Sequence, residues 1–151
     1  MARMHTRRRG KSSSRRFPRT ALPEWAVLDA SEIGNTVLAL RNQGLTPSRI
    51  GMALRDRYGV PSARLAGKRV TRLLEEKGAA PKIPEDLAAL LGRAVRLSKH
   101  LGAHKTDVHN RRNLQRVESK IRRLARYYSR TGKLPTDWNY SLETAEVLLA
   151  R

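Results

Sequence analysis

Apolar residues recur at helical spacing in two long stretches of the second half of the chain. In the first stretch they are Leu87, Leu90, Leu91, Ala94, Leu97 and Leu101. In the second they are Leu114, Val117, Ile121, Leu124 and Tyr128. Each stretch places one apolar stripe along a helix, and Thr131 with Gly132 ends the second. Because only a short connection separates them, we expect two long helices packed antiparallel, stripe against stripe.

Shorter apolar runs in the first half predict three small helices separated by glycines. We expect Ser31 to cap the first helix and Gly44 to end it. Thr46 as cap and Pro47 at the first helical position predict the second. The third is expected over residues 60–78. Together the three predict a small helical module.

The same three helices also fit a helix-turn-helix, in which the third would be the recognition helix. That interpretation would make the chain a DNA-binding or architectural protein. The side chains reading a duplex would then be Arg64, Lys68, Arg69 and Arg72. Any small helical unit of this length produces the same pattern, so a packing module with a basic rim is the competing interpretation.

The predicted fold class is all-α, in four segments. Pro81 and Pro84 interrupt the helical pattern in the middle of the chain, and Pro84 suits the start of a new helix. After Lys133 a turn containing proline leads into a short helix capped by Ser141. The expected segments are a basic extended arm over 1–21, a small helical module over 22–80, a helical hairpin over 81–133 and a C-terminal tail over 134–151.

The net charge of the chain says more about its class of binding partner than its length does. The 151 residues include 32 Lys and Arg against 13 Asp and Glu, a formal net charge of +19. This excess far exceeds what solubility requires, so a polyanion is the first partner to consider.

Cysteine is absent, which excludes a disulfide framework and thiolate metal ligands. No apolar run has the length that a bilayer requires, so we expect a soluble, unsecreted protein without a membrane partner.

The first 20 residues contain eight Lys and Arg and no acid. Such a segment cannot bury enough apolar surface to offset the entropy of ordering it, so alone we expect it to be disordered. It is interpreted as an arm that folds into a nucleic-acid groove, although a targeting peptide or a solubilising tail has a similar composition. The candidate RNA-binding arm residues are Arg3, Arg7, Arg8, Arg9, Lys11, Arg15, Arg16 and Arg19.

One side of the second long helix is predicted to be mostly arginine. At about 100° per residue, the arc opposite the apolar stripe holds arginines, with Lys120 and Tyr127 on its shoulder. A surface helix normally mixes charges of both signs, whereas here like charges repeat at repulsive spacing. Phosphate groups would relieve that repulsion. The arginines of this arc are Arg112, Arg116, Arg123, Arg126 and Arg130.

The turn between the two long helices carries histidines, an aspartate and an asparagine. His100 and His104 are four residues apart, with Asp107 and His109 close behind, so a metal site has to be considered. The spacing is permissive rather than specific, and we predict no metal. Histidines that only favour the end of a helix are a second alternative. Compact donors and acceptors on a tight turn fit the shallow minor groove of A-form RNA better.

Asp107 is informative because a carboxylate in a basic patch repels phosphate. It is therefore expected to contact a base edge or a 2′-hydroxyl, or to orient a neighbouring histidine. The full set of candidate RNA-binding residues is His100, His104, Asp107, Asn110, Arg111, Arg112, Arg116, Lys120, Arg123, Arg126, Tyr127 and Arg130.

Little in the sequence suggests catalysis. The GKSS run at Gly10 lacks the upstream glycine of a phosphate-binding loop, and no nucleophile lies in a strained turn bounded by glycines. We therefore expect no enzyme, no cofactor and no small-molecule substrate. Near the end of the chain, Trp138 and Tyr140 either stack on bases or pin the tail back on the body of the protein, and the second is the favoured interpretation.

At these residues the chain resembles a known family. HLGAHKTDVHNRRNLQRVESKIRRLARYY, preceded by IPEDLAALLGRAVRLSK, is similar to the small-subunit ribosomal protein fifteen family. The opening MARMH and the segments GLTPSRIGMALRDRYGVP, APKIPEDL and LPTDWNY resemble its longer archaeal and eukaryotic form, so the likeness covers essentially the whole chain.

The resemblance implies a helical structural protein without a catalytic role. It implies binding to the central domain of small-subunit rRNA, at a three-way junction and an adjoining helix, early in assembly. The implied partners are that rRNA and neighbouring ribosomal proteins, with the protein as a monomer in the cytoplasmic ribosome.

The resemblance also assigns individual positions. His100, His104 and Asp107 match the family's minor-groove turn, and Arg123 and Tyr127 match residues near the junction. The chain departs from the bacterial form at two places. Asn110 occupies a position where the bacterial form commonly has serine, and the Thr-Gly pair before the bacterial hairpin has no counterpart around residue 80.

Overall fold

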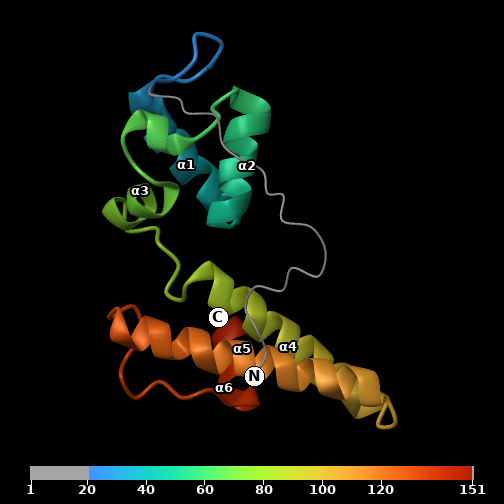
Figure 1. Ribbon diagram of the computed structural model, residues 1–151. Coiled ribbons are helices and arrows are strands. Elements are labelled where there is room, and N and C mark those ends of the chain that lie inside the picture. Colours follow the sequence, from blue (N-terminus) through green and yellow to red (C-terminus); the bar gives the residue numbers. More distant parts are fainter. Residues whose placement is uncertain (1–20, 151) are drawn as a thin grey trace, which may run out of the picture. The chain divides into compact units, whose positions relative to one another are not determined.

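A computed structural model describes residues 21–150 of the chain, and the regular elements of this part are all helices (Figure 1). The predicted all-α fold class is thereby confirmed. The expected disorder of the basic arm concerns residues 1–20, which lie outside the described residues. The chain divides between Pro81 and Lys82 into two compact units, which are considered separately below. In the described residues, no helix combines the length and apolarity needed to cross a membrane.

The first unit contains three α-helices and one short 3-10 helix. They are α1 (Ala30–Asn42), α2 (Pro47–Tyr58), η1 (Ala63–Ala66) and α3 (Val70–Glu76). Side chains from all four elements form one apolar core, together with Val60 between α2 and η1. Its buried members are Ile33, Val37, Leu40, Ile50, Leu54, Val60, Ala63 and Leu74.

Local capping signals explain where α1 and α2 begin. Thr46 caps α2, since its side-chain oxygen accepts a hydrogen bond from the Arg49 N–H at 3.5 Å, and Pro47 is the first helical residue, as predicted. The prediction that Ser31 caps α1 is wrong, because the cap is Asp29. Glu32, three residues after Asp29, completes a capping box by accepting from the Asp29 N–H at 3.4 Å. A cap at Ser31 would place glycine at that third position.

The single third helix predicted over 60–78 is also wrong, because Gly67 divides it. Gly67 has a φ of +91°, in the left-handed region that favours glycine, and its N–H donates to the Arg64 carbonyl to close η1. The chain is then extended at Arg69 before α3 starts at Val70. The helix after Gly67 has 7 residues, so it is much shorter than the predicted recognition helix.

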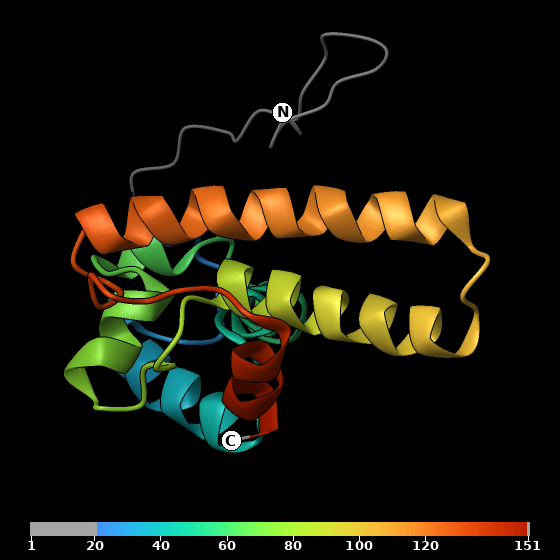
Figure 2. The same cartoon turned by 90° about the horizontal axis from the view of Figure 1, so that it is seen from below.

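The second unit is a long helical hairpin with a short third helix. The helices are α4 (Glu85–Ala103), α5 (Val108–Arg130) and α6 (Leu142–Ala150). Figure 2 shows α4 and α5 antiparallel and side by side, as the two apolar stripes predict. Their packed stripes form the core, which α6 extends by packing on α4. The buried members of this core are Leu87, Leu91, Ala94, Val95, Val117, Ile121, Tyr128, Leu134 and Ala145.

The C-terminal tail folds back onto this hairpin. Trp138 and Tyr140 are half-buried and pack against the core, which confirms that these aromatic residues hold the tail in place. The hydroxyl of Ser141 accepts a hydrogen bond from the Thr144 N–H at 3.0 Å and caps α6, as expected.

A polar contact ties the hairpin at the end opposite its turn. The Tyr128 hydroxyl lies 2.6 Å and 2.8 Å from the two carboxylate oxygens of Asp86, to which it donates. Burial, and then this carboxylate, raise the pKa of Tyr128 well above its usual range. The neutral hydroxyl is therefore the form that the folded hairpin prefers.

Replacing Tyr128 by phenylalanine is expected to lower the free energy of unfolding at neutral pH by about 1–2 kcal/mol, because a hydrogen bond to a charged acceptor is lost. The raised pKa adds a second signature. Wild-type stability should be complete below about pH 10 and decline as the pH rises further toward the folded-state pKa, whereas Tyr128→Phe should lack this part of the decline. Urea unfolding at pH 7 and at high pH measures both effects. Tyr127→Phe, at an exposed neighbouring position, is the control. It should leave the stability at pH 7 unchanged and keep most of the decline at high pH, since Tyr127 is the smallest cause of the raised Tyr128 pKa.

Candidate RNA interface

The outer side of α5 is strongly basic. The helix contains eight Lys and Arg and a single acid, Glu118. Its buried positions, Val117, Ile121, Ala125 and Tyr128, face the core, which leaves most of the charge on the other side. Glu118 lies 3.7 Å from Arg122, and within the described part of the chain this is the only ion pair formed along α5. The remaining positive charge is therefore available to an anionic partner.

The structure places most members of the predicted arginine arc in solvent. Arg112, Arg116, Arg126 and Arg130 are exposed, as is Tyr127 on the shoulder. Lys120 and Arg123 are half-buried. The Arg123 Nε donates to the Ser119 carbonyl at 3.4 Å, so its guanidinium is held close to its own helix.

In the turn, three of the predicted residues contact one another around the Asp107 carboxylate. The Nε2 of His100 lies 3.0 Å from Oδ2 of Asp107, and the side-chain amide of Asn110 donates to the same oxygen at 2.7 Å. The other oxygen, Oδ1, accepts from the Asn110 backbone N–H at 2.9 Å and caps α5. One carboxylate thus joins the end of α4 to the start of α5.

This geometry determines that the Asp107 carboxylate is ionised and which ring nitrogen of His100 donates to it. The three hydrogen bonds hold the pKa of Asp107 well below its usual range, with the backbone N–H of Asn110 as the largest cause. The carboxylate is therefore ionised at neutral pH and acts only as an acceptor. Nε2 of His100 must carry a proton to donate to it. The Asn110 amide, 3.4 Å from Nε2, consequently makes its hydrogen bond to Asp107 and not to His100.

The other predicted turn residues surround this network. His104 is exposed, and its ring lies beside that of His100 with 4.6 Å between ring centroids. Arg111 donates to the Lys105 carbonyl at 2.6 Å, so it braces the turn. Asn113, which the sequence did not single out, donates to the side chain of Asn110 at 3.2 Å. Contacts across a turn are set by its backbone path, so spacing alone does not reveal them.

Two other candidate sites were considered, the basic rim of the first unit and a metal site. Lys68 and Arg72 both lie near Glu76, at 2.6 Å and 3.7 Å, so part of the basic rim in the first unit is neutralised. Because the predicted recognition helix is divided at Gly67, nothing in the described first unit favours the helix-turn-helix interpretation, in which it would bind a DNA duplex. Among the described residues, no three His, Asp or Glu side chains cluster in a way that could hold a metal ion.

The arm residues lie outside the described part of the chain. Arg3, Arg7, Arg8, Arg9, Lys11, Arg15, Arg16 and Arg19 belong to residues 1–20, so their contribution stays a prediction.

Two ribosomal family models match this chain, one in each half. Residues 1–60 match the family described as the ribosomal S13/S15 N-terminal domain, and residues 70–148 match ribosomal protein S15. Proteins named small ribosomal subunit protein uS15 are similar over the full length of both chains. Identity is 53% for the one from Methanoculleus marisnigri, 51% for Methanococcoides burtonii and 49% for Methanocella arvoryzae. These matches confirm the resemblance inferred from the hairpin and its flanks. The chain belongs to the ribosomal protein S15 family.

Proposed function

We propose that the chain is a structural protein of the small ribosomal subunit that binds rRNA with α5 and the turn before it. The observation that supports this most is the one-sided charge of α5. Apart from Arg122, its exposed arginines have no acidic partner among residues 21–150, and they lie beside a turn of compact donors and acceptors. The relatives' printed name, small ribosomal subunit protein, supports the same assignment. Its role is to bind and shape RNA, without catalysis.

The two parts of the surface perform different tasks. Arg112, Arg116, Arg126 and Arg130 supply affinity by displacing counterions from phosphates, so their contribution decreases as salt increases. The turn supplies recognition, since His100 and His104 are compact enough to reach a shallow minor groove. The target is a three-way junction and the adjoining helix in the central domain of small-subunit rRNA.

Asp107 acts in this proposal through His100. Its oxygens already accept three hydrogen bonds within the turn, so it holds the imidazole in one orientation instead of reading a base itself. With Nε2 directed at Asp107, Nδ1 is the ring nitrogen that His100 can offer to RNA. Asn110 completes the same arrangement, and Arg111 keeps the turn closed.

Other segments extend the binding surface and the assembly. We propose that the arm, Arg3 to Arg19, adds phosphate contacts on the RNA, and that the tail after Lys133 lies beside neighbouring ribosomal proteins. The protein is a monomer in the cytoplasmic ribosome and needs neither a cofactor nor a small-molecule substrate.

The double substitution Arg112→Gln with Arg116→Gln tests the arginine surface. We expect weaker binding to the junction RNA and a shallower dependence of log affinity on log salt, by about two units, since two phosphate contacts are removed. Filter binding across a range of salt concentrations measures the slope.

The control removes the same charge from exposed positions on α4, by Arg93→Gln with Lys99→Gln. Its slope should stay close to that of wild type. An unchanged slope in the Arg112/Arg116 variant would mean that RNA binds a different face.

A further inference from the structure

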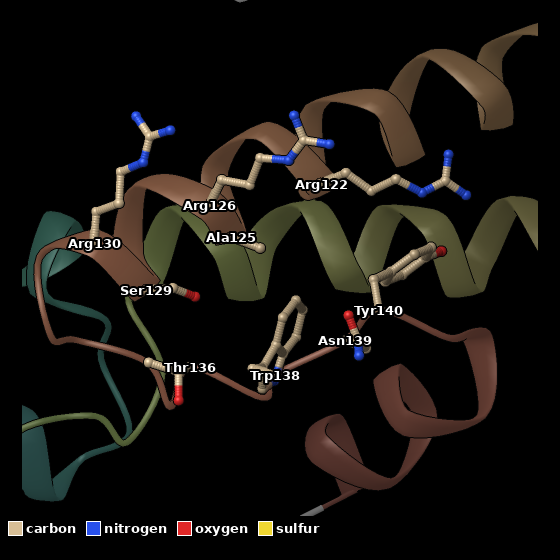
Figure 3. Close-up of a pocket in the computed structure, with 9 residues that line it drawn as sticks. All are labelled: Arg122, Ala125, Arg126, Ser129, Arg130, Thr136, Trp138, Asn139 and Tyr140. Carbon is tan, nitrogen blue, oxygen red and sulfur yellow. The ribbon is translucent and has the colours of Figure 1, made fainter.

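A groove of about 420 Å³ lies between one edge of α5 and the returning tail (Figure 3). It belongs entirely to the second unit. Its lining combines arginines, small polar groups and two aromatic rings, a mixture that differs from the purely basic outer side of α5. The lining residues are Arg122, Ala125, Arg126, Ser129, Arg130, Thr136, Trp138, Asn139 and Tyr140.

Three arginines form the rim of this groove. Arg122, Arg126 and Arg130 follow one another at intervals of four residues, which places them in a row along α5 with a rise of about 6 Å per step. In Figure 3 the guanidinium groups of Arg126 and Arg130 project away from the tail segment. Arg122 is 62% exposed and lies 3.7 Å from Glu118, whose side chain is 20% exposed, so this carboxylate offsets part of the Arg122 charge. An anion at the rim would meet a row of positive charges.

The opposite wall is aromatic and fixed in place. Trp138 is half-buried against the core yet lines the groove, and Figure 3 shows its ring beneath Ala125. Tyr140 lines the far end, where burial raises the pKa of its hydroxyl to about 12, so it is neutral at physiological pH. Ser129, Thr136 and Asn139 add short polar side chains between the rim and the rings.

We propose that this groove binds one unpaired nucleotide, with its phosphate on the arginine rim and its base against Trp138. The arginine rim and the aromatic wall indicate the class of ligand. A nucleotide carries an anionic phosphate for the rim and a flat base with polar edges for the aromatic wall. Base stacking on aromatic side chains is the usual way in which proteins hold unpaired bases. The volume lies within the range of pockets that take small organic ligands.

Two other ligands fit the groove less well. A continuous duplex has its base faces stacked inside, so it offers nothing to an aromatic wall. An acidic peptide would satisfy the arginines but carries no flat ring to stack on Trp138. The proposal rests on the RNA-binding function proposed above and adds a second contact, formed by Arg122 and the tail, to that of the turn.

The test uses the full chain in a Trp25→Phe background, where Trp138 is the remaining tryptophan. Fluorescence of Trp138 is followed while hexa-adenylate, adenosine monophosphate, inorganic phosphate or hexaglutamate is added. Hexa-adenylate should quench the emission, and adenosine monophosphate should do so at higher concentration. Phosphate and hexaglutamate should leave it nearly unchanged. Quenching by the mononucleotide as strong as by the hexamer would indicate a site for free nucleotides instead of RNA.

Two matched pairs of variants separate this groove from the junction surface. Arg122→Gln should weaken hexa-adenylate binding about fivefold, whereas Arg93→Gln, an exposed arginine on α4, should not. In otherwise wild-type chains, Trp138→Leu should weaken binding of labelled hexa-adenylate about tenfold, measured by anisotropy, and Trp25→Leu should have little effect.

Junction RNA binding by the same proteins distinguishes the possible failures. If hexa-adenylate does not quench while the junction still binds, the groove proposal is wrong and the proposed function stands. If neither RNA binds, both are wrong. If hexaglutamate quenches as well as the oligonucleotide, the groove receives an acidic peptide and the nucleotide assignment fails.

Discussion

Replacing Asp107 by alanine is expected to reduce discrimination between the cognate junction and a scrambled RNA helix by about tenfold, while the salt dependence of binding stays nearly intact. The substitution removes all three hydrogen bonds that orient His100 and Asn110. A well-placed polar contact to a base edge is worth about 1–3 kcal/mol, so losing the orientation of His100 should cost an effect of this size. Loss of the α5 cap should also lower the free energy of unfolding by about 1 kcal/mol. Filter binding to both RNAs, with urea unfolding in parallel, measures these changes.

Two further variants sharpen this result. Asp107→Asn keeps one acceptor for the Asn110 N–H but brings no negative charge to His100, so it should lose discrimination with less loss of stability. Asp137→Ala removes an exposed carboxylate from the tail and serves as the charge-matched control. Equal weakening on the cognate and scrambled RNAs would refute the role in recognition and leave Asp107 as a helix cap only.

Replacing Ile121 by alanine should produce the largest loss of stability. Ile121 is fully buried at the middle of the hairpin core, where it packs among residues of α4 and α5. Removing a buried Ile side chain to alanine typically costs about 2–5 kcal/mol, from lost transfer energy and from the cavity left behind. Since small domains are stable by about 5–15 kcal/mol, this loss should be evident as a lower urea midpoint.

Leu149→Ala is the matched control, since it removes the same number of carbon atoms from a side chain that is 41% exposed on α6. It should cost no more than about 1 kcal/mol. If the two substitutions cost the same, Ile121 cannot lie in a close-packed core.

The helices were predictable where one local signal dominated. The apolar stripe from Leu87 to Leu101 has a single period, and Thr46 with Pro47 is an unambiguous start, so both were confirmed. Prediction failed where two signals competed. Asp29 and Ser31 are both good caps, and only the carboxylate of Glu32 decides between them. Gly67 was compatible with a helix by composition, but its left-handed backbone ends η1 there.

The candidate site was predictable to a different degree in each of its parts. The arginine arc follows from helical periodicity alone, so the sequence identifies it as soon as the helix is assigned. The network at the turn joins His100 to Asp107, and the path of the backbone between them decides whether these side chains meet. The groove depends on how the tail returns to α5, which brings Trp138 near Arg126. No periodic pattern encodes such a return, so Arg122 was not among the predicted site residues.

Both ends of the helical hairpin are tied, by Asp107 at the turn and by the Tyr128 hydroxyl on Asp86 at the other end. Fraying of the helix termini is thereby opposed, and α5 is a stiff rod of 23 residues, about 35 Å long. A stiff rod fixes the intervals between its arginines before any RNA arrives. RNA helices whose phosphates do not match those intervals lose contacts that a flexible basic segment would keep. Rigidity in the protein therefore becomes selectivity for the shape of the RNA.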